Sequence, residues 1–259
     1  MRIAKLVIVP FVLLSVGCFQ GQRTFKVNAD GSGTIVDITK LGEQAKGMLQ
    51  GMEQMDQSSP AEKKAKKMAK YAEKAAAMGE GVTFVSIVTG KDGSDVTTYA
   101  FKDITKVKAP GMPTPDESTT TKAGLITFKL AKNAAGNTVL TVVSPKEEPA
   151  AATKAGAKPT PKPKPEEVQQ QIAMMKGMLA GLKIKSVVEV NGTLVKTDSP
   201  YAVGSAVTLM EMDFDALDAA ALQKMSESGS GGPPSPAMMK GIKGIKVSEP
   251  EVTIEFKRK

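Results

Sequence analysis

Short segments in which apolar and polar residues alternate recur along the chain. Alternation with a period of two is typical of a strand with one buried face, and turn residues separate many of these segments. The pattern predicts hairpins that pair 24–28 with 34–38, 82–89 with 95–101, 125–130 with 138–143, and 183–190 with 193–197 across Asn191-Gly192. Two further strands are predicted at 205–212 and 251–256.

Other segments have the helical period, with apolar residues three or four positions apart. Ser59-Pro60-Ala61-Glu62 has the form of a capping box with proline at the first helical position, and it predicts a surface helix over 60–78. A short helix is expected at 213–225. Two amphipathic helices are predicted at 41–55, with the stripe Leu41, Ala45, Met48, Met52 and Met55, and at 165–182, with the stripe Val168, Ile172, Met175, Leu179 and Leu182.

Residues 145–165 consist of Pro, Ala, Lys and other small or polar residues, with no large apolar side chain, and predict a disordered linker. Together the elements predict an α+β fold, in which antiparallel β-hairpins form a sheet with amphipathic helices on one face, interrupted by this Pro/Lys/Ala-rich linker. We expect one composite domain over 24–259. The alternative is two domains, 24–144 and 166–259.

The first residues have the layout of a secretion signal. Arg2 and Lys5 precede a short apolar run, and small residues follow, so residues 1–17 are expected to be a signal peptide and not a membrane-spanning helix. Cys18, the only cysteine in the chain, comes next. The stretch LLSVGC resembles the lipobox of bacterial lipoproteins, although Ser15 stands where the lipobox has a large aliphatic residue.

In that family the cysteine is acylated and becomes the mature N-terminus. The resemblance therefore implies lipidation at Cys18, a lipidated tether over 18–23 and a location in the cell envelope. The alternative is an ordinary secreted protein that is cleaved near Gly17. Phe19 replaces the aspartate that retains lipoproteins at the inner membrane, so we expect an outer-membrane address, facing the periplasm or the cell surface.

The net charge is +8, of which Arg2 and Lys5 contribute two. This charge favours anionic surfaces such as lipid headgroups. It does not indicate a nucleic-acid partner, because the basic stretches lack interleaved aromatic residues.

Composition also limits the chemistry of the protein. The chain has no histidine, and its one cysteine is assigned to the anchor, so serine–histidine and cysteine–histidine catalysis are excluded. No phosphate-binding loop or dinucleotide fingerprint is present. We expect a protein that is not an enzyme and needs no cofactor.

Two patterns suggest metal binding. Residues 28–33 place oxygen-bearing side chains at alternating positions, as a calcium loop does, but Thr39 replaces the acid that closes such a loop, and a hairpin turn is favoured. The pairs Met52 with Met55 and Met175 with Met178 have a spacing that suits copper(I), but methionine also fills cores. A calcium- or copper-binding lipoprotein is therefore an alternative and not the main prediction.

The apolar helical stripes raise the question of a ligand. Met48, Met52, Met175 and Leu179 are predicted to line a groove for an apolar or lipid ligand or for a partner protein. The order of leader, Cys18, strand, DGSG turn, strand, helix and Asn-Gly hairpin is similar to LppM-type bacterial lipoproteins, and this implies a membrane-tethered sheet domain that binds lipid or another apolar ligand. A structural envelope lipoprotein without a ligand pocket is the alternative.

Overall fold

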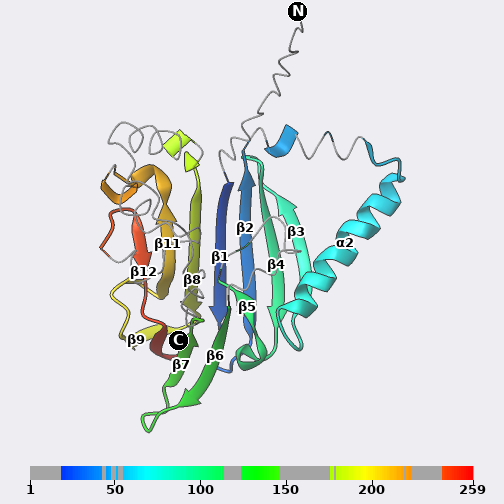
Figure 1. Ribbon diagram of the computed structural model, residues 1–259. Coiled ribbons are helices and arrows are strands. Elements are labelled where there is room, and N and C mark those ends of the chain that lie inside the picture. Colours follow the sequence, from blue (N-terminus) through cyan, green and yellow to red (C-terminus); the bar gives the residue numbers. More distant parts are fainter. Residues whose placement is uncertain are drawn as a thin grey trace, which may run out of the picture.

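The computed structural model describes residues 19–42, 45–47, 51, 55–111, 113, 124–145, 176–177, 179–218, 220–222 and 241–258. These residues form a mixed α/β fold that is dominated by strands in two mainly antiparallel sheets (Figure 1). Two short 3-10 helices, η1 (Ile104–Lys106) and η2 (Phe214–Ala216), connect strands. No described helix is long and apolar enough to cross a membrane.

The larger sheet has the strand order β10-β11-β8-β1-β2-β4-β3. A further strand, β12, pairs with a part of β11 that does not pair with β10. The strands of this sheet are β1 (Phe19–Val27), β2 (Gly33–Leu41), β3 (Thr83–Thr89), β4 (Ser94–Phe101), β8 (Lys183–Val190), β10 (Ala202–Val203), β11 (Ala206–Asp213) and β12 (Ile245–Val247). The central strand β1 pairs antiparallel with β2 and parallel with β8.

The smaller sheet has the order β5-β6-β7-β13-β9. Its strands are β5 (Ala109–Pro110), β6 (Leu125–Lys132), β7 (Thr138–Val143), β9 (Thr193–Thr197) and β13 (Glu251–Lys257). Each sheet therefore contains strands from both sides of residues 145–165.

The main core lies between the two sheets. Alternation directs Phe25, Val27 and Ile35 of the larger sheet to one face, here called the inner face, where they join a buried cluster with residues of the smaller sheet. The rings of Phe25 and Phe128 lie 5.0 Å apart, centroid to centroid. The smaller sheet contributes Ile126, Phe128, Leu140, Val142, Val252, Ile254 and Phe256.

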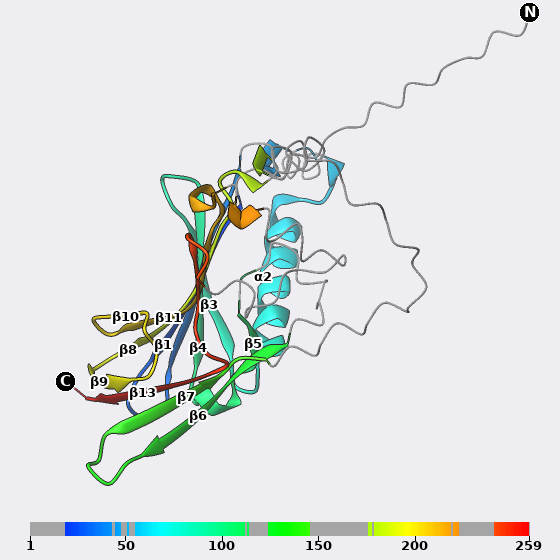
Figure 2. The ribbon, with the colours of Figure 1, turned by 60° about the vertical axis from the view of Figure 1, so that its left-hand side comes forward.

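Helix α2 (Pro60–Ala77) begins and ends as the sequence predicts. The Ser59 side chain accepts from the Glu62 N–H and the Glu62 carboxylate accepts from the Ser59 N–H, so the capping box is confirmed. The helix stands beside the inner face of the larger sheet (Figure 2), where Tyr71 stacks on Phe84 at 5.2 Å. Its lysines are mostly exposed, but Lys74 is only 16% exposed because it points toward Asp37 of β2.

The face of α2 that carries alanine and methionine is covered only near the end of the helix. Ala61, Ala65, Met68 and Ala72 are exposed, whereas Ala75 is buried. The helix contacts the sheet mainly through its last turns, so only residues near its C-terminal end are covered.

The predicted tether is wrong for residues 19–23, which belong to β1. Phe19 pairs with Leu41, and Arg23 pairs with both Asp37 and Ser186. The segment has few apolar residues, and its buried positions on the inner face are Gly21 and Arg23, the latter in an ion pair with Asp37.

The predicted Asn191-Gly192 hairpin is also wrong. β8 belongs to the larger sheet and β9 to the smaller, where β9 pairs with β13. The Asn191 amide group donates to the Asn28 side chain, and a Cβ on Gly192 would lie 2.3 Å from the Lys257 carbonyl oxygen. The Asn191-Gly192 dipeptide thus allows the chain to cross from the larger sheet to the smaller one at a point where it passes close to the Lys257 backbone.

The other three hairpins and both single strands are confirmed, most of them longer than predicted. Of helix 41–55, Leu41 ends β2, and residues 45–47, 51 and 55 are helical; the remainder lies outside the described residues, apart from Gly42. Of the helix predicted at 213–225, Asp213 ends β11, residues 214–216 form η2 and residues 220–222 are helical, whereas 219 and 223–225 lie outside the described residues. Residues 146–175, which hold most of the linker and of helix 165–182, lie outside it.

Candidate functional site

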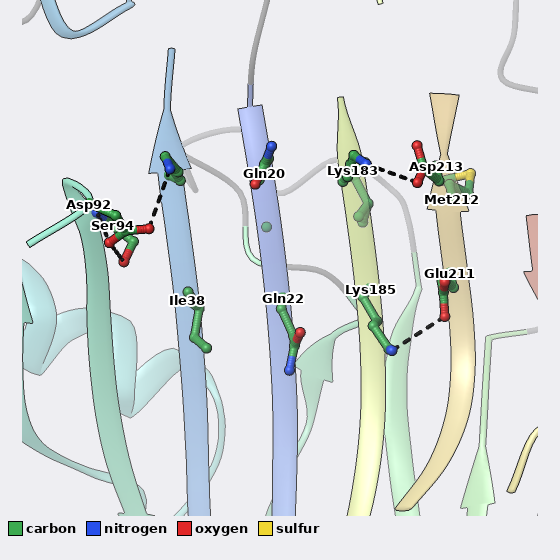
Figure 3. A pocket seen from close by; sticks show the side chains of 13 residues that line it. Gln20, Gln22, Ile38, Asp92, Ser94, Lys183, Lys185, Glu211, Met212 and Asp213 are labelled. Carbon is green, nitrogen blue, oxygen red and sulfur yellow. Dashed lines mark hydrogen bonds and ion pairs between the residues drawn. The ribbon is translucent and has the colours of Figure 1, made fainter. Parts of the chain in front are cut away.

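A concavity lies on the outer face of the larger sheet, opposite α2 and the smaller sheet. It is an open trough with a volume of about 270 Å³ that crosses five strands, β4, β2, β1, β8 and β11 (Figure 3). It lies near the end of the sheet at which β1 begins. We call it the polar trough.

The register of the strands builds the polar trough from two rows of outward side chains. Gln20 and Gln22 of β1 occupy the middle of the two rows, and both are labelled in Figure 3. The first row is Ser94, Lys40, Gln20, Lys183 and Asp213, and the second is Ile38, Gln22, Lys185 and Glu211.

Cross-strand ion pairs occupy the flanks of the trough. Lys183 Nζ lies 3.0 Å from Asp213 Oδ2, and Lys185 Nζ lies 3.3 Å from Glu211 Oε2. On the other side, Lys40 Nζ lies 3.3 Å from Asp92 Oδ2. Three lysines thus face three acids, so the lining has no excess of either charge.

These contacts shift the pKa values of Asp92, Lys183 and Glu211, and each shift favours the charged form of the group. Hydrogen bonds from the Ser94 hydroxyl and backbone N–H lower the pKa of Asp92 to about 2. The hydrogen bond to Asp213 raises the pKa of Lys183 above its ordinary value. Burial acts to raise the pKa of Glu211, but Lys246 and Lys185 outweigh it, and the net shift is downward. All three groups are therefore charged at neutral pH.

The middle of the trough is neutral and polar. Gln22 donates to the Thr24 hydroxyl at 3.1 Å, and Gln20 is exposed and makes no side-chain hydrogen bond within the described part of the chain. The free amide group of Gln20, between the ion pairs, can donate to and accept from a peptide or another polar molecule. The lining contains no cysteine, histidine or aromatic side chain.

A second polar cluster lies on the inner face and is fully enclosed. Arg23 has no exposed surface, and its guanidinium forms two hydrogen bonds to Asp37, of 2.7 and 2.6 Å. Arg23 also donates to the Pro110 carbonyl oxygen at 2.7 Å, and Lys74 Nζ lies 3.8 Å from Asp37. The Ser186 hydroxyl beside it is buried and has no hydrogen-bond partner among the residues that the structure describes. We interpret this cluster as structural, since its charges satisfy one another.

Most of the site residues predicted from sequence cannot be placed. Cys18, Met48, Met52 and Met175 lie outside the described residues. Leu179 is described and partly buried, in a helical turn that leads into β8. The groove predicted from these residues is therefore neither assembled nor excluded.

Reasoning from sequence missed both polar clusters. The alternation Gln20-Gly21-Gln22 beside Lys183-Ile184-Lys185 was the available signal for the polar trough. Because β1 and β8 are distant in sequence, that signal has meaning only once their parallel pairing is known.

The metal sites considered from sequence find no support within the described residues. No group of three or more His, Cys, Asp or Glu there could hold a metal ion. Of residues 28–33, Gly33 begins β2 and 28–32 form the turn between β1 and β2, where the Asp30 carboxylate accepts from the Ser32 N–H and hydroxyl. Met55 is 83% exposed, and its proposed partner Met52 lies outside the described part.

Comparison with known proteins finds no matching family model, no matching curated protein and no matching solved structure.

Proposed function

We propose that this protein is a lipid-anchored lipoprotein of the cell envelope that binds a partner and catalyses no reaction. One observation carries the proposal: the only cysteine, Cys18, lies between an apolar leader and strand β1, which begins at Phe19. A leader that is removed before Cys18 leaves β1 whole. A cut a few residues later would remove a strand segment that pairs on both sides.

The polar trough is the surface we assign to the partner. The free amide group of Gln20 and the paired charges suit a polar partner, such as an extended segment of an envelope protein, better than an acyl chain. A bound apolar or lipid ligand depends on Met48, Met52 and Met175 and is the second candidate. A purely structural lipoprotein is the third, and the continuous buried cluster between the sheets supports it.

The anchor is tested by Cys18→Ser. In cells fed an alkyne analogue of palmitate, the unaltered protein should be labelled and should sediment with membranes. The Cys18→Ser variant should lose the label and leave the membrane pellet. A variant that stays in the pellet would refute the anchor.

The partner surface is tested by a photo-crosslinking amino acid placed at Gln20. In intact cells it should form a discrete adduct, whereas the same amino acid at Ala135, in the turn between β6 and β7, should form none. Equal adducts from both positions would contradict a partner site in the polar trough. Native mass spectrometry of protein purified from membranes would then report any retained lipid.

A further inference from the structure

Strand β1 leaves no spacer between Cys18 and the folded sheet. Phe19 pairs with Leu41, and Gln20 pairs with both Lys40 and Lys183, so β1 is held from its first residues. Covalent geometry places the Cα atom of Cys18 about 3.8 Å from that of Phe19. A lipid on Cys18 would therefore be joined almost directly to the central strand of the larger sheet.

Several elements end at the level of Phe19. Leu41 ends β2, the turn 90–93 joins β3 to β4, and β8 begins at Lys183. Asp213 ends β11 and pairs with Lys183. We call this set of strand ends and turns the anchor end. The opposite end holds the turn 28–32 and, beside it, the turn 133–137, since Lys132 Nζ donates to the Ala29 carbonyl oxygen at 3.2 Å.

We propose that the anchor end lies directly against the headgroups of the membrane that holds Cys18. This inference rests on the proposed function and adds an orientation to it. Because the anchor is at the middle of the sheet and has no spacer, the strands stand with their anchor-end tips on the lipid surface. The turns 28–32 and 133–137 then face away from the membrane.

The chemistry of the anchor end fits a headgroup layer and not the hydrocarbon interior. Asp92 and Lys40 form an exposed ion pair there, and Lys183 pairs with Asp213. Lys91 is exposed, as is Lys243, and neither has an ion pair within the described residues. Lys243 belongs to this end because the neighbouring Gly244 carbonyl oxygen accepts from the Asp213 N–H. These ammonium groups can meet lipid phosphates.

The orientation also limits what can reach the polar trough. Gln20 is two residues from Cys18, which corresponds to about 7 Å along a strand. The first row of the trough thus borders the headgroup layer. Its partner must be another membrane-bound protein or a segment that lies along the membrane.

The test uses the single native cysteine. Once Cys18 is acylated, an introduced cysteine is the only free thiol. We would attach a fluorophore in Lys91→Cys, at the anchor end, and in Ala135→Cys, at the opposite end. Each acylated full-length protein would be placed in phosphatidylcholine–phosphatidylglycerol vesicles that carry a headgroup-linked quencher. Strong quenching is expected at position 91 and none at position 135.

A third protein carries a flexible spacer of about eight Gly and Ser residues between Cys18 and Phe19, with a reach of about 16 Å. The spacer should reduce quenching at position 91 about two-fold or more, because the sheet can then move off the surface. Equal quenching at both positions, or no effect of the spacer, would overturn the orientation. Flotation with the vesicles is measured first: a protein that does not float refutes the anchor itself, so the two failures are distinct.

Discussion

Arg23 and Asp37 show how a charged residue can occupy the inner face of the central strand. Both side chains are almost completely removed from solvent, at 0% and 2% exposure, and the two-pronged contact satisfies both charges. Desolvation of such a pair offsets much of its attraction, so the pair contributes little net stability as a unit. Removing only one partner destabilises the protein strongly, because it leaves the other charge buried and uncompensated.

We therefore expect Asp37→Ala to lower the free energy of unfolding by about 3–5 kcal/mol. The paired replacement Arg23→Met with Asp37→Leu should restore part of the loss, since the buried guanidinium is removed together with its partner, while Lys74 still loses its contact with Asp37. Urea unfolding measures both variants. Lys67→Ala, at an exposed position of α2, is the control and should hardly move the midpoint. An Asp37→Ala midpoint equal to that of the control would show that the pair is not buried.

Asp92 illustrates how one turn sets a protonation equilibrium. In the unfolded chain its pKa is near 3.8, and in the folded protein Ser94 and Lys40 lower it to about 2. A lowered folded-state pKa means that Asp92 stabilises the fold above pH 3.8 and that this contribution is lost as the pH falls toward 2.

An NMR titration of the Asp92 carboxyl should therefore give a midpoint near pH 2. Ser94→Ala should raise this midpoint toward 3.8, because it removes the largest stabilising hydrogen bond. Lys40→Met should raise it less. A midpoint that is unchanged in Ser94→Ala would rule out the hydroxyl as the cause.

At the scale of elements, the crossing from β8 to β9 depends on Gly192. The chain passes so close to β13 that a side chain there would meet the Lys257 backbone. Gly47 lies in a helical segment with open space around it, which makes it a suitable comparison.

We expect Gly192→Ala to destabilise the protein by about 1–3 kcal/mol, through overpacking against a backbone that cannot easily move. Gly47→Ala should instead be neutral or stabilising by up to about 1 kcal/mol, since alanine favours a helix. Thermal melts of the two variants provide the measurement. Equal shifts would mean that the crossing is not crowded.

At the scale of the whole molecule, the two sheets join the parts of the chain on either side of residues 145–165. β8 follows that segment and pairs with β1, and β13 follows it and pairs with β7. A chain cut within the segment would keep these pairings and the shared core.

Limited proteolysis is therefore expected to cut first at Lys154, Lys158, Lys162 or Lys164, and the two fragments should still elute together in size-exclusion chromatography. They should separate only in denaturant. First cleavage between residues 63 and 74, in α2, would contradict the predicted linker. Fragments that separate under native conditions would contradict the shared sheets.

Whether a feature could be predicted from the sequence depends on how far apart in the chain the residues that determine it lie. Local signals sufficed for the turn at Asp30, the capping box at Ser59 and the strands that follow tight turns, because neighbouring residues decide these features. The hairpin prediction at Asn191-Gly192 was wrong because the same dipeptide suits both a tight hairpin turn and a close crossing between two sheets. The tether prediction for residues 19–23 was wrong because the sequence does not distinguish a buried, paired arginine such as Arg23 from an exposed one.

Neighbouring residues were enough to predict most of the strands, helix α2 and the apolar leader before the only cysteine. The pairing of β1 with β8, the contact of Arg23 with Asp37, and the trough in which Gln20 and Gln22 meet the lysines of β8 became visible only in the folded structure. The difference is one of sequence separation. Strand period and capping depend on residues a few positions apart, whereas parallel pairing joins segments about 160 residues apart and is selected by the packing of the whole core.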